Sequence, residues 1–520
     1  MEMTAVAVAS RYQHASTSIT GRLPAGPPPV WAQTLTDLVC GVRRDGGEGR
    51  VTDHLGVALD AAMVDQAAAA LEAAGVQADD VVLVEAHNTL ASIAAMLALW
   101  QKGCVVCPID PECSSLVRVL IAATAEATAV VATDGSVQRL GGIRRDPVVR
   151  LIRPKRVTGV DVALIVFTSG SSGNPKGVVL THHNAMSALR AISTYLGLTE
   201  QDRILAIPPL FFDYGLYQLL LSLFTGCTLV VANENRSVAK LAPVIAAVQP
   251  TVLPVVPALA SGIGRMLQIR KTAVPSVRLV TNTGGHLPEA CIALLQEVFP
   301  NVNTVPMYGL TECKRALYCD RARFPDAPDS VGVPMPGLDA RVVVEDAAGD
   351  FREAGVDEVG ELWVRGSSVM QGYLGVDSGA GARLVQGRYR SDTWLATGDL
   401  FRVDGRGLHY FKGRAKSLIK QGGYCLVPRD IEEMAERLPD VETAVVVGRT
   451  EDSGDERAVI FVQLAGESDL ERRNAARAAL RTTIPRTLMP REITFVSDWP
   501  TTGNGKIDRA ALARGEGYAL

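Results

Sequence analysis

The sequence feature that most constrains the fold is a glycine-rich segment, residues 168–177, which lies between two apolar stretches. The five residues before it, 163–167, are apolar and mostly branched, which predicts a buried strand. Residues 178–180 predict a second strand. Glycines let the backbone turn tightly and approach a ligand, and hydroxyls, N–H groups and a lysine offer donors and positive charge to phosphate oxygens. The segment therefore carries the groups that a triphosphate needs.

Two alternative interpretations of this segment are a Walker A loop and a plain turn in a hairpin. No Gly-Lys-Ser/Thr follows Gly173 at the Walker spacing, which excludes the first. A plain turn requires fewer than the three glycines, four hydroxyls and one lysine found here. We expect a phosphate-binding loop that uses Thr168, Ser169, Gly170, Ser171, Ser172, Gly173 and Lys176.

The chain has 520 residues, which is too long for one ordinary core, so we expect at least two domains. A net charge of −4 gives no argument for a nucleic-acid or anionic-membrane partner. No apolar run reaches the length of a membrane span and no basic leader is present, so we expect a cytoplasmic protein without a membrane partner. Cys104 and Cys107 lie in an apolar stretch, which favours reduced structural thiols.

Predicted helices and strands alternate from about residue 60 to residue 256, which indicates a parallel sheet covered by helices. From about residue 339, short strands and glycine turns indicate a smaller β-rich lobe, and a compact α+β unit of about 100 residues follows. We expect an α/β fold with a small C-terminal domain. The expected parts are a loosely ordered segment 1–29, an N-terminal domain 30–413 with the lobe at about 339–413, and a C-terminal domain 414–520.

The glycine-rich segment resembles the phosphate-binding signature of the adenylate-forming superfamily, which comprises acyl-CoA synthetases, adenylation domains of peptide synthetases and luciferases. Other stretches resemble the family's further signatures in the family's order, over roughly residues 30–515. The resemblance implies a ligase that uses ATP to convert a carboxylate into an acyl-AMP with release of pyrophosphate. The acyl group is then transferred to an acceptor.

Residues 308–312, Tyr-Gly-Leu-Thr-Glu, follow a predicted strand and match the family's second nucleotide signature. The resemblance assigns Glu312 to a Mg²⁺ that bridges the phosphates, and such a cation is commonly held by one or two carboxylates plus phosphate. It places Thr311 at the α-phosphate, Tyr308 at the adenine, and Gly309 beside nucleotide and substrate. A solvated loop carboxylate is the alternative for Glu312.

Residues 282–286 end another predicted strand, and in the family this segment lies along the adenine and the acyl pocket. The resemblance therefore assigns Gly284 and Gly285 to the nucleotide site. Asp399, in a Thr-Gly-Asp sequence, resembles the aspartate that accepts hydrogen bonds from the ribose hydroxyls, and Arg414 would join it at the ribose and phosphates. A structural salt bridge is the alternative for Asp399 and Arg414.

Lys416 stands where relatives carry the hinge about which the C-terminal domain rotates. Residues 417–424 after it resemble the segment that enters the active site in the second half-reaction. Residues 502–508 carry the last signature, which makes Lys506 the catalytic lysine of adenylation. Carboxylate attack on the α-phosphorus concentrates negative charge on phosphoryl oxygens, which a lysine from the second domain can neutralise. The resemblance thus implies four catalytic residues: Lys176, Thr311, Glu312 and Lys506.

Residues 209–216 are the most informative about the substrate. In many CoA ligases the place of Phe212 gates the acyl pocket, and in amino-acid adenylation domains the aspartate of a Phe-Asp pair binds the substrate's α-ammonium. Asp213 falls at that place, and a buried carboxylate needs a partner. A substrate amine, a nearby arginine or protonation would each serve, and we favour the amine slightly. The expected substrate-binding residues are Phe212, Asp213, Gly215, Gly284 and Gly309.

No carrier or condensation domain is recognised in the chain, so we expect a stand-alone enzyme. The family's usual acceptor is a thiol, of CoA or of a carrier protein's phosphopantetheine, whereas a few members transfer to an amine. A non-catalytic nucleotide-binding homologue is a further alternative, which degraded motifs would favour. Residues 313–315 either line the pocket or acceptor channel or begin an ordinary helix. The expected cofactors and partners are ATP, Mg²⁺, a small carboxylic or amino acid, and CoA or a carrier protein, in a biosynthetic pathway for a secondary metabolite.

Overall fold

The fold is that of a computed structural model, and each statement below concerns the residues that it describes. These are residues 32–44, 50–141, 156–169, 175–232, 237–346, 348–374, 383–387, 392–421, 424–450, 456–466, 468–486, 488–502 and 506–519. Within these ranges, no helix combines the length and the apolar character that crossing a membrane demands.

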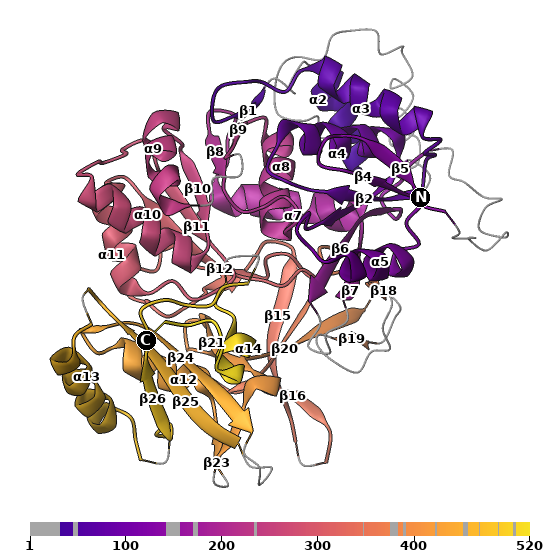
Figure 1. The fold of residues 1–520 in the computed structure, drawn as a ribbon. Coiled ribbons are helices and arrows are strands. Elements are labelled where there is room, and N and C mark those ends of the chain that lie inside the picture. Colours follow the sequence, from indigo (N-terminus) through magenta and orange to yellow (C-terminus); the bar gives the residue numbers. More distant parts are fainter. Residues whose placement is uncertain are drawn as a thin grey trace, which may run out of the picture.

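The first of two large sheets, which we name the β2 sheet, has the strand order β18-β7-β6-β3-β2-β4-β5 (Figure 1). Its central strands β6, β3, β2 and β4 are parallel, whereas β7, β18 and β5 are antiparallel to their neighbours. The apolar run of β2 is buried throughout, as expected for a parallel strand covered on both faces. The strands are β2 (Val81–Glu85), β3 (Val105–Ile109), β4 (Ala129–Val131), β5 (Val137–Arg139), β6 (Val162–Ser169), β7 (Pro175–Thr181) and β18 (Gly372–Leu374).

The second large sheet, the β10 sheet, has the order β1-β9-β8-β10-β11-β12-β13-β14. Its strands from β1 to β12 are parallel, and β13 and β14 are added antiparallel at one edge. The strands are β1 (Val51–Asp53), β8 (Arg203–Ala206), β9 (Thr228–Val231), β10 (Val252–Val255), β11 (Leu279–Asn282), β12 (Asn303–Tyr308), β13 (Leu317–Tyr318) and β14 (Val333–Pro334).

Helices cover both sheets. One apolar core joins residues of the two sheets through α4, α7 and α8, and α9, α10 and α11 pack on the opposite face of the β10 sheet, as Figure 1 shows. Helix α5 packs on the outer face of the β2 sheet. The helices are α2 (Leu35–Arg44), α3 (Ala61–Ala73), α4 (Leu90–Lys102), α5 (Ser115–Thr124), α7 (His182–Leu196), α8 (Asp213–Thr225), α9 (Val238–Val248), α10 (Pro257–Ile269) and α11 (Glu289–Val298).

Helix α7 begins directly after strand β7. Thr181 is its N-cap, and its side chain accepts a hydrogen bond from the Asn184 backbone N–H while the Asn184 side chain accepts one from the Thr181 backbone. This reciprocal capping satisfies two helix-end donors. Gly197 ends the helix with a φ of 56°, a left-handed conformation that glycine adopts without a steric cost.

An antiparallel lobe follows the two large sheets and leads to a small C-terminal domain, drawn in orange to yellow in Figure 1. The lobe strands are β15 (Leu338–Glu345), β16 (Phe351–Glu353), β17 (Gly360–Gly366), β19 (Arg383–Gln386), β20 (Thr393–Val403) and β21 (His409–Arg414). The C-terminal elements are η2 (Ala415–Ser417), β22 (Ile419–Gln421), β23 (Tyr424–Leu426), α12 (Pro428–Glu436), β24 (Val441–Thr450), β25 (Glu456–Leu464), α13 (Leu470–Thr483), β26 (Glu492–Phe495) and α14 (Arg509–Arg514).

The predicted fold class is confirmed: an α/β protein with a large domain of helix-covered sheets, an antiparallel lobe and a small α+β domain. The segment 1–29 lies outside the described residues, and the domain boundaries and the mobility of the C-terminal domain stay predictions. Lys416, the expected hinge, lies in the short helix η2 between lobe and C-terminal domain. Cys104 and Cys107 are buried and form no disulfide.

Candidate active site

The predicted phosphate loop joins β6 to β7. The two strands pair antiparallel, so that Thr168 lies opposite Lys176 and Ser169 opposite Pro175. Residues 170–174, which include four of the predicted phosphate contacts, lie outside the described residues. A hairpin is therefore present, but it does not exclude a phosphate site, since the loop residues are carried at its tip.

Lys176 and Glu312 both contact the side chain of Tyr373. Lys176 is 5% exposed, and its Nζ lies 5.3 Å from the centre of the Tyr373 ring. The Tyr373 hydroxyl donates a hydrogen bond of 2.5 Å to Oε1 of Glu312. Strand β18 pairs with β7 and positions Tyr373 beside the loop. Burial and the Glu312 charge raise the pKa of Tyr373 above its usual range, so this hydroxyl remains a donor.

Tyr308, Asp399 and Arg414 form a second group. The Tyr308 hydroxyl donates to Oδ2 of Asp399 at 2.7 Å, and Nε of Arg414 lies 3.2 Å from Oδ1 of the same carboxylate. Asp399 and Arg414 are paired in register on β20 and β21. Burial raises the pKa of the Asp399 carboxyl, although Arg414 and Tyr308 oppose the shift. The salt bridge considered from sequence is thus present between the two predicted ribose residues.

Lys506 reaches this region from the C-terminal domain. A Cβ added to Gly284 would lie 2.7 Å from Cε of Lys506, and Nζ of Lys506 lies 5.3 Å from the centre of the Phe212 ring. Burial lowers the pKa of Lys506, Arg414 lowers it further, and the charges of Asp213 and Asp399 oppose the shift. The predicted catalytic lysine and the predicted ribose and substrate residues therefore act on one another electrostatically.

The glycines at the site are required for different physical reasons. Gly284 has a φ of +84° and faces Lys506, so both its conformation and its contact exclude a side chain. A Cβ on Gly215 would lie 2.1 Å from the Pro209 carbonyl oxygen, and one on Gly309 would lie 1.8 Å from the Lys314 carbonyl oxygen. Gly215 and Gly309 are therefore required by close packing of the protein's own backbone, a reason that the sequence did not reveal.

Asp213 already has a cationic neighbour in the protein. Oδ2 of Asp213, at the start of α8, lies 3.9 Å from Nζ of Lys314. Lys314 and Arg315 belong to a turn that leads into β13, so the alternative in which residues 313–315 begin a helix is wrong. The turn is closed by hydrogen bonds from the Cys313 and Lys314 N–H groups to the Leu310 carbonyl and packs against Gly309.

Three supporting residues were missed from the sequence. Tyr373 holds Glu312, and Glu361 accepts hydrogen bonds from the Gly398 N–H at 2.8 Å and from the Trp363 indole N–H at 2.9 Å, next to Asp399. Asn88 donates to the carbonyls of residues 206–208 and accepts from the Leu210 N–H, which fixes the segment before Phe212. Only the position of Asn88 just after a buried strand offered a sequence signal.

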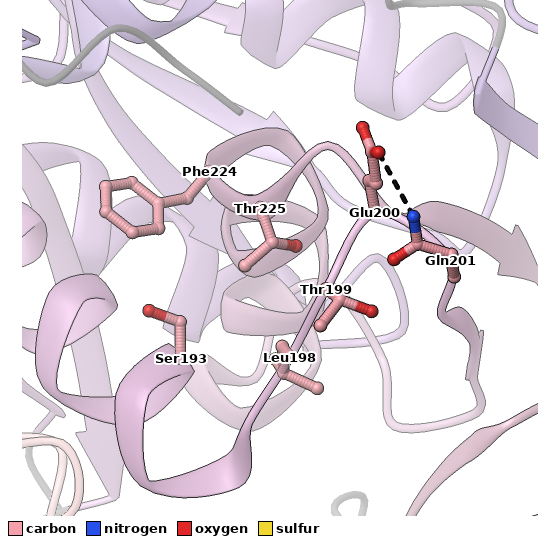
Figure 2. A pocket seen from close by; sticks show the side chains of 7 residues that line it. All are labelled: Ser193, Leu198, Thr199, Glu200, Gln201, Phe224 and Thr225. Atoms are coloured by element: carbon pink, nitrogen blue, oxygen red, sulfur yellow. Dashed lines mark hydrogen bonds between the residues drawn. The ribbon is translucent and has the colours of Figure 1, made fainter. Parts of the chain in front are cut away.

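A surface pocket of about 390 Å³ lies elsewhere, between the C-terminal ends of α7 and α8 and the connection that follows α7. Figure 2 shows its lining side chains and the hydrogen bond of 3.1 Å between Glu200 and Gln201. The lining residues are Ser193, Leu198, Thr199, Glu200, Gln201, Phe224 and Thr225. None of them is a predicted site residue, and Glu200 is the only charged one, so we assign this pocket no part in the chemistry.

The family follows from comparison with known proteins. The profile of the AMP-binding enzyme family matches residues 61–374, and that of the AMP-binding enzyme C-terminal domain matches residues 430–506. The chain belongs to this family of AMP-binding, adenylate-forming enzymes.

Similar proteins differ widely in length and name. Phenyloxazoline synthase MbtB of Mycobacterium sp. (strain MCS) is 31% identical over 458 residues, which cover 85% of this chain and 38% of the synthase. The chain thus spans about two fifths of that relative's length. Acyl-CoA synthetase 7 of Caenorhabditis elegans is 28% identical over 484 residues, which cover 85% of this chain and 86% of that protein.

Solved structures share the fold. The anthranilate CoA ligase AuaEII, in complex with anthranoyl-AMP, superposes with a TM-score of 0.77 at 19% identity, over 95% of this chain and 98% of that chain. The amide bond synthetase McbA from Marinactinospora thermotolerans superposes with a TM-score of 0.75 at 23% identity, over 92% of this chain and 99% of that chain. At these identities the likeness shows the fold.

Proposed function

We propose that the protein activates a small carboxylic acid as its acyl-AMP and then transfers the acyl group to a thiol, of CoA or of a carrier protein. The observation that carries the proposal is the position of Lys506, which extends from the C-terminal domain to Gly284 and Phe212 and lies within electrostatic reach of Asp399 and Arg414. One lysine therefore connects the predicted ribose and substrate residues. A degraded, non-catalytic homologue would not be expected to retain this arrangement.

In the first step a substrate carboxylate oxygen attacks the α-phosphorus of ATP, an O–P bond forms, and the bond to pyrophosphate breaks. Negative charge grows on the α-phosphoryl oxygens, and the ammonium of Lys506 stabilises it in a site that the second domain closes. Asp399 and Arg414 orient the ribose, and Lys176 offers a second cation near the loop. Thr311 contributes its hydroxyl at the α-phosphate.

Glu312 fits the expected role of Mg²⁺ ligand. The described residues include no group of three or more His, Cys, Asp and Glu side chains that would hold a metal alone. A single carboxylate fixed by Tyr373 suits a Mg²⁺ that takes its other ligands from phosphates and water. When bound, the ion would neutralise charge on the phosphates. Glu312 would supply one oxygen ligand, and Tyr373 would hold that carboxylate in place.

The acceptor and the pathway are the less constrained parts of the proposal. Two proteins with this fold are a CoA ligase and an amide bond synthetase, so the fold itself is compatible with both thiol and amine acceptors. A thiol is the family's usual acceptor, and Lys416 would be the hinge that exchanges the two half-reactions. A cytoplasmic location, a carrier-protein partner and a role in secondary metabolism stay predictions.

The test of adenylation is ATP–pyrophosphate exchange with a panel of amino acids, aryl acids and short acyl acids. We expect exchange with at least one acid, and Lys506→Ala should reduce its rate about 10²–10³-fold because the transition-state charge is no longer neutralised. ATP binding, followed as a rise in the melting temperature, should persist in the variant.

Lys240→Ala is the matched control, because Lys240 is an exposed lysine on α9 remote from the predicted site residues. It should exchange at the wild-type rate. Folded protein that binds ATP but exchanges with no acid would contradict carboxylate activation. Adding CoA, a phosphopantetheinyl carrier protein or an amine to the active mixture then identifies the acceptor by the product formed.

A further inference from the structure

A cluster of buried charged and aromatic side chains lies behind the candidate reaction site. The turn after Glu312 carries Lys314 and Arg315, each 2% exposed. Nζ of Lys314 lies 5.2 Å from the centre of the Tyr217 ring, and the Arg315 guanidinium lies 5.7 Å from that ring and 4.8 Å from the Tyr214 ring. Both tyrosines stand on α8, the helix that begins with Asp213. The aromatic faces attract the cations but provide no oxygen lone pair along the N–H directions.

Three hydrogen-bond donors in this cluster are unused. Among the described residues, Nζ of Lys314, Nε of Arg315 and the Tyr217 hydroxyl have no hydrogen-bond partner. The nearest carboxylate oxygen to Lys314, on Asp213, is 3.9 Å away, beyond hydrogen-bond distance. Buried donors without partners are rare and costly in folded proteins, and charged ones are the most costly. The cluster therefore lacks an acceptor.

The cluster also lacks one negative charge. Lys314 and Arg315 bring two cations, and Asp213 brings one carboxylate. Glu312 also acts on Lys314, but its Oε1 accepts the hydrogen bond of Tyr373. A ligand group that supplies acceptors and one negative charge would satisfy the cluster. A substrate ammonium would instead meet two cations, and an apolar chain would leave the donors unpaired.

The backbone supports a functional reason for this arrangement. Lys314 has a φ of +68°, in the left-handed region that a lysine adopts at a steric cost. A residue held there is a marker of a constrained site when the surrounding structure fixes it. Here the turn packs against Gly309, whose missing side chain leaves room for the Lys314 carbonyl.

The cluster is continuous with the place of reaction. Asp213 follows Phe212, whose ring faces Lys506, and the charge of Asp213 acts on Lys506. A substrate whose reacting carboxylate lies near Lys506 would extend past Phe212 toward Asp213 and Lys314. The far end of such a substrate is then the part that meets the unused donors.

We propose that Lys314 and Arg315 bind a second carboxylate of the substrate, so that the acid that this ligase activates is a dicarboxylic acid. The proposal rests on the proposed function, because it names the substrate class of the same adenylation site. The Tyr217 hydroxyl donates to the same carboxylate. Asp213 has Lys314 as its partner in this arrangement, and not a substrate amine.

The first test compares diacids with monoacids of equal length in wild-type pyrophosphate exchange. The pairs are succinic and butyric, glutaric and pentanoic, adipic and hexanoic, and terephthalic and 4-methylbenzoic acid, with α-amino acids as a further group. We expect at least one diacid to exceed its partner about 100-fold in kcat/KM. If every monoacid equals or exceeds its diacid, or amino acids are preferred, the dicarboxylate proposal is wrong while carboxylate activation stands. If no acid exchanges, the proposed function itself fails.

The second test assigns the preference to the two cations. Arg315→Leu and Lys314→Met each remove a buried charge and keep most of the side-chain volume, so the folded state is expected to survive. Each should raise KM for the preferred diacid about 30-fold or more and leave the matched monoacid within about 3-fold. The conservative Arg315→Lys should retain part of the preference. An unchanged ratio of diacid to monoacid in both apolar variants overturns the proposal.

Discussion

At the residue scale, Gly284 of the large domain is in contact with Lys506 of the C-terminal domain, and this contact is possible because glycine has no side chain. Gly284 lies after β11, and the methylene groups of Lys506 occupy the space that a Cβ would fill. The resemblance to the family assigned this glycine to the nucleotide site. The structure adds a second reason, because the lysine that carries the proposed catalytic charge reaches its place across the glycine backbone.

Gly284→Ala is expected to displace Lys506 and to reduce pyrophosphate exchange by up to about 10²-fold, since the lysine can no longer approach the α-phosphate. The φ of +84° adds a strain of about 1 kcal/mol, visible as a modest fall in melting temperature. Gly135→Ala is the control, because Gly135 has the same φ but no atom within 4 Å of its added Cβ. Equal activity in both variants would contradict the contact with Lys506.

Single residues were predicted from the sequence where a motif names them, and missed where only the tertiary structure does. Lys506 and Asp399 lie in recognisable signatures, and the structure brings them into one electrostatic group. The contact of Asp213 with Lys314 joins residues about 100 positions apart, and no periodicity predicts it. Tyr373 was missed for the same reason, because its role depends on the pairing of β18 with β7.

At the element scale, apolar runs and capping residues in the sequence were enough to predict many of the helices and strands. The alternation of helices and strands predicted from about residue 60 to residue 256 agrees with β2, α4 and β3, and the predicted C-terminal α+β unit agrees with β24, β25 and α13. The pairing of strands could not be predicted from the sequence, since the antiparallel additions to the two parallel sheets depend on which edges meet.

A buried histidine at the start of α7 links this helix to α2. Nδ1 of His182 accepts a hydrogen bond of 3.0 Å from the backbone N–H of Leu35, the first residue of α2.

This histidine makes the stability depend on pH. Burial lowers the pKa of His182 to about 4, against an ordinary value of 6.5, and the charges of Asp161 and Asp37 oppose the shift only partly. The unfolded chain therefore binds more protons than the folded chain between pH 6.5 and 4. The stability that the neutral imidazole contributes is complete above pH 6.5 and is lost as the pH falls toward 4.

His182→Leu should lower the free energy of unfolding at pH 7.5 by about 1–3 kcal/mol, because the Leu35 N–H loses its acceptor. It should also weaken the loss of stability between pH 6.5 and 4. Urea unfolding at pH 7.5 and pH 5 measures both effects. The neighbouring His183, which is exposed, gives the matched control His183→Leu, for which little change is expected. An unaltered pH dependence in His182→Leu would disprove the role of the histidine.

At the scale of the whole molecule, the C-terminal domain is docked on the large domain in an arrangement that suits adenylation. Lys506 lies in the candidate site, and at the rim Arg265 of α10 forms an ion pair with Glu442 of β24. The Glu442 side chain is 17% exposed and that of Arg265 is 46% exposed. If Lys416 is a hinge, this pair is one of the contacts that must break when the domain rotates for acyl transfer.

Breaking the ion pair should therefore slow adenylation without slowing acyl transfer. Exposed or half-exposed pairs stabilise by up to about 1 kcal/mol, so Glu442→Gln is expected to slow pyrophosphate exchange about 2- to 5-fold at low salt and less at high salt. Acyl transfer from preformed acyl-AMP should not slow. The exchanged pair Arg265→Glu with Glu442→Arg should restore exchange, and Glu353→Gln, which breaks an exposed ion pair with Arg341 on the lobe, should leave both steps unaltered. Equal slowing of both half-reactions would contradict a contact specific to the adenylation arrangement, because a contact kept in both arrangements cannot favour one of them.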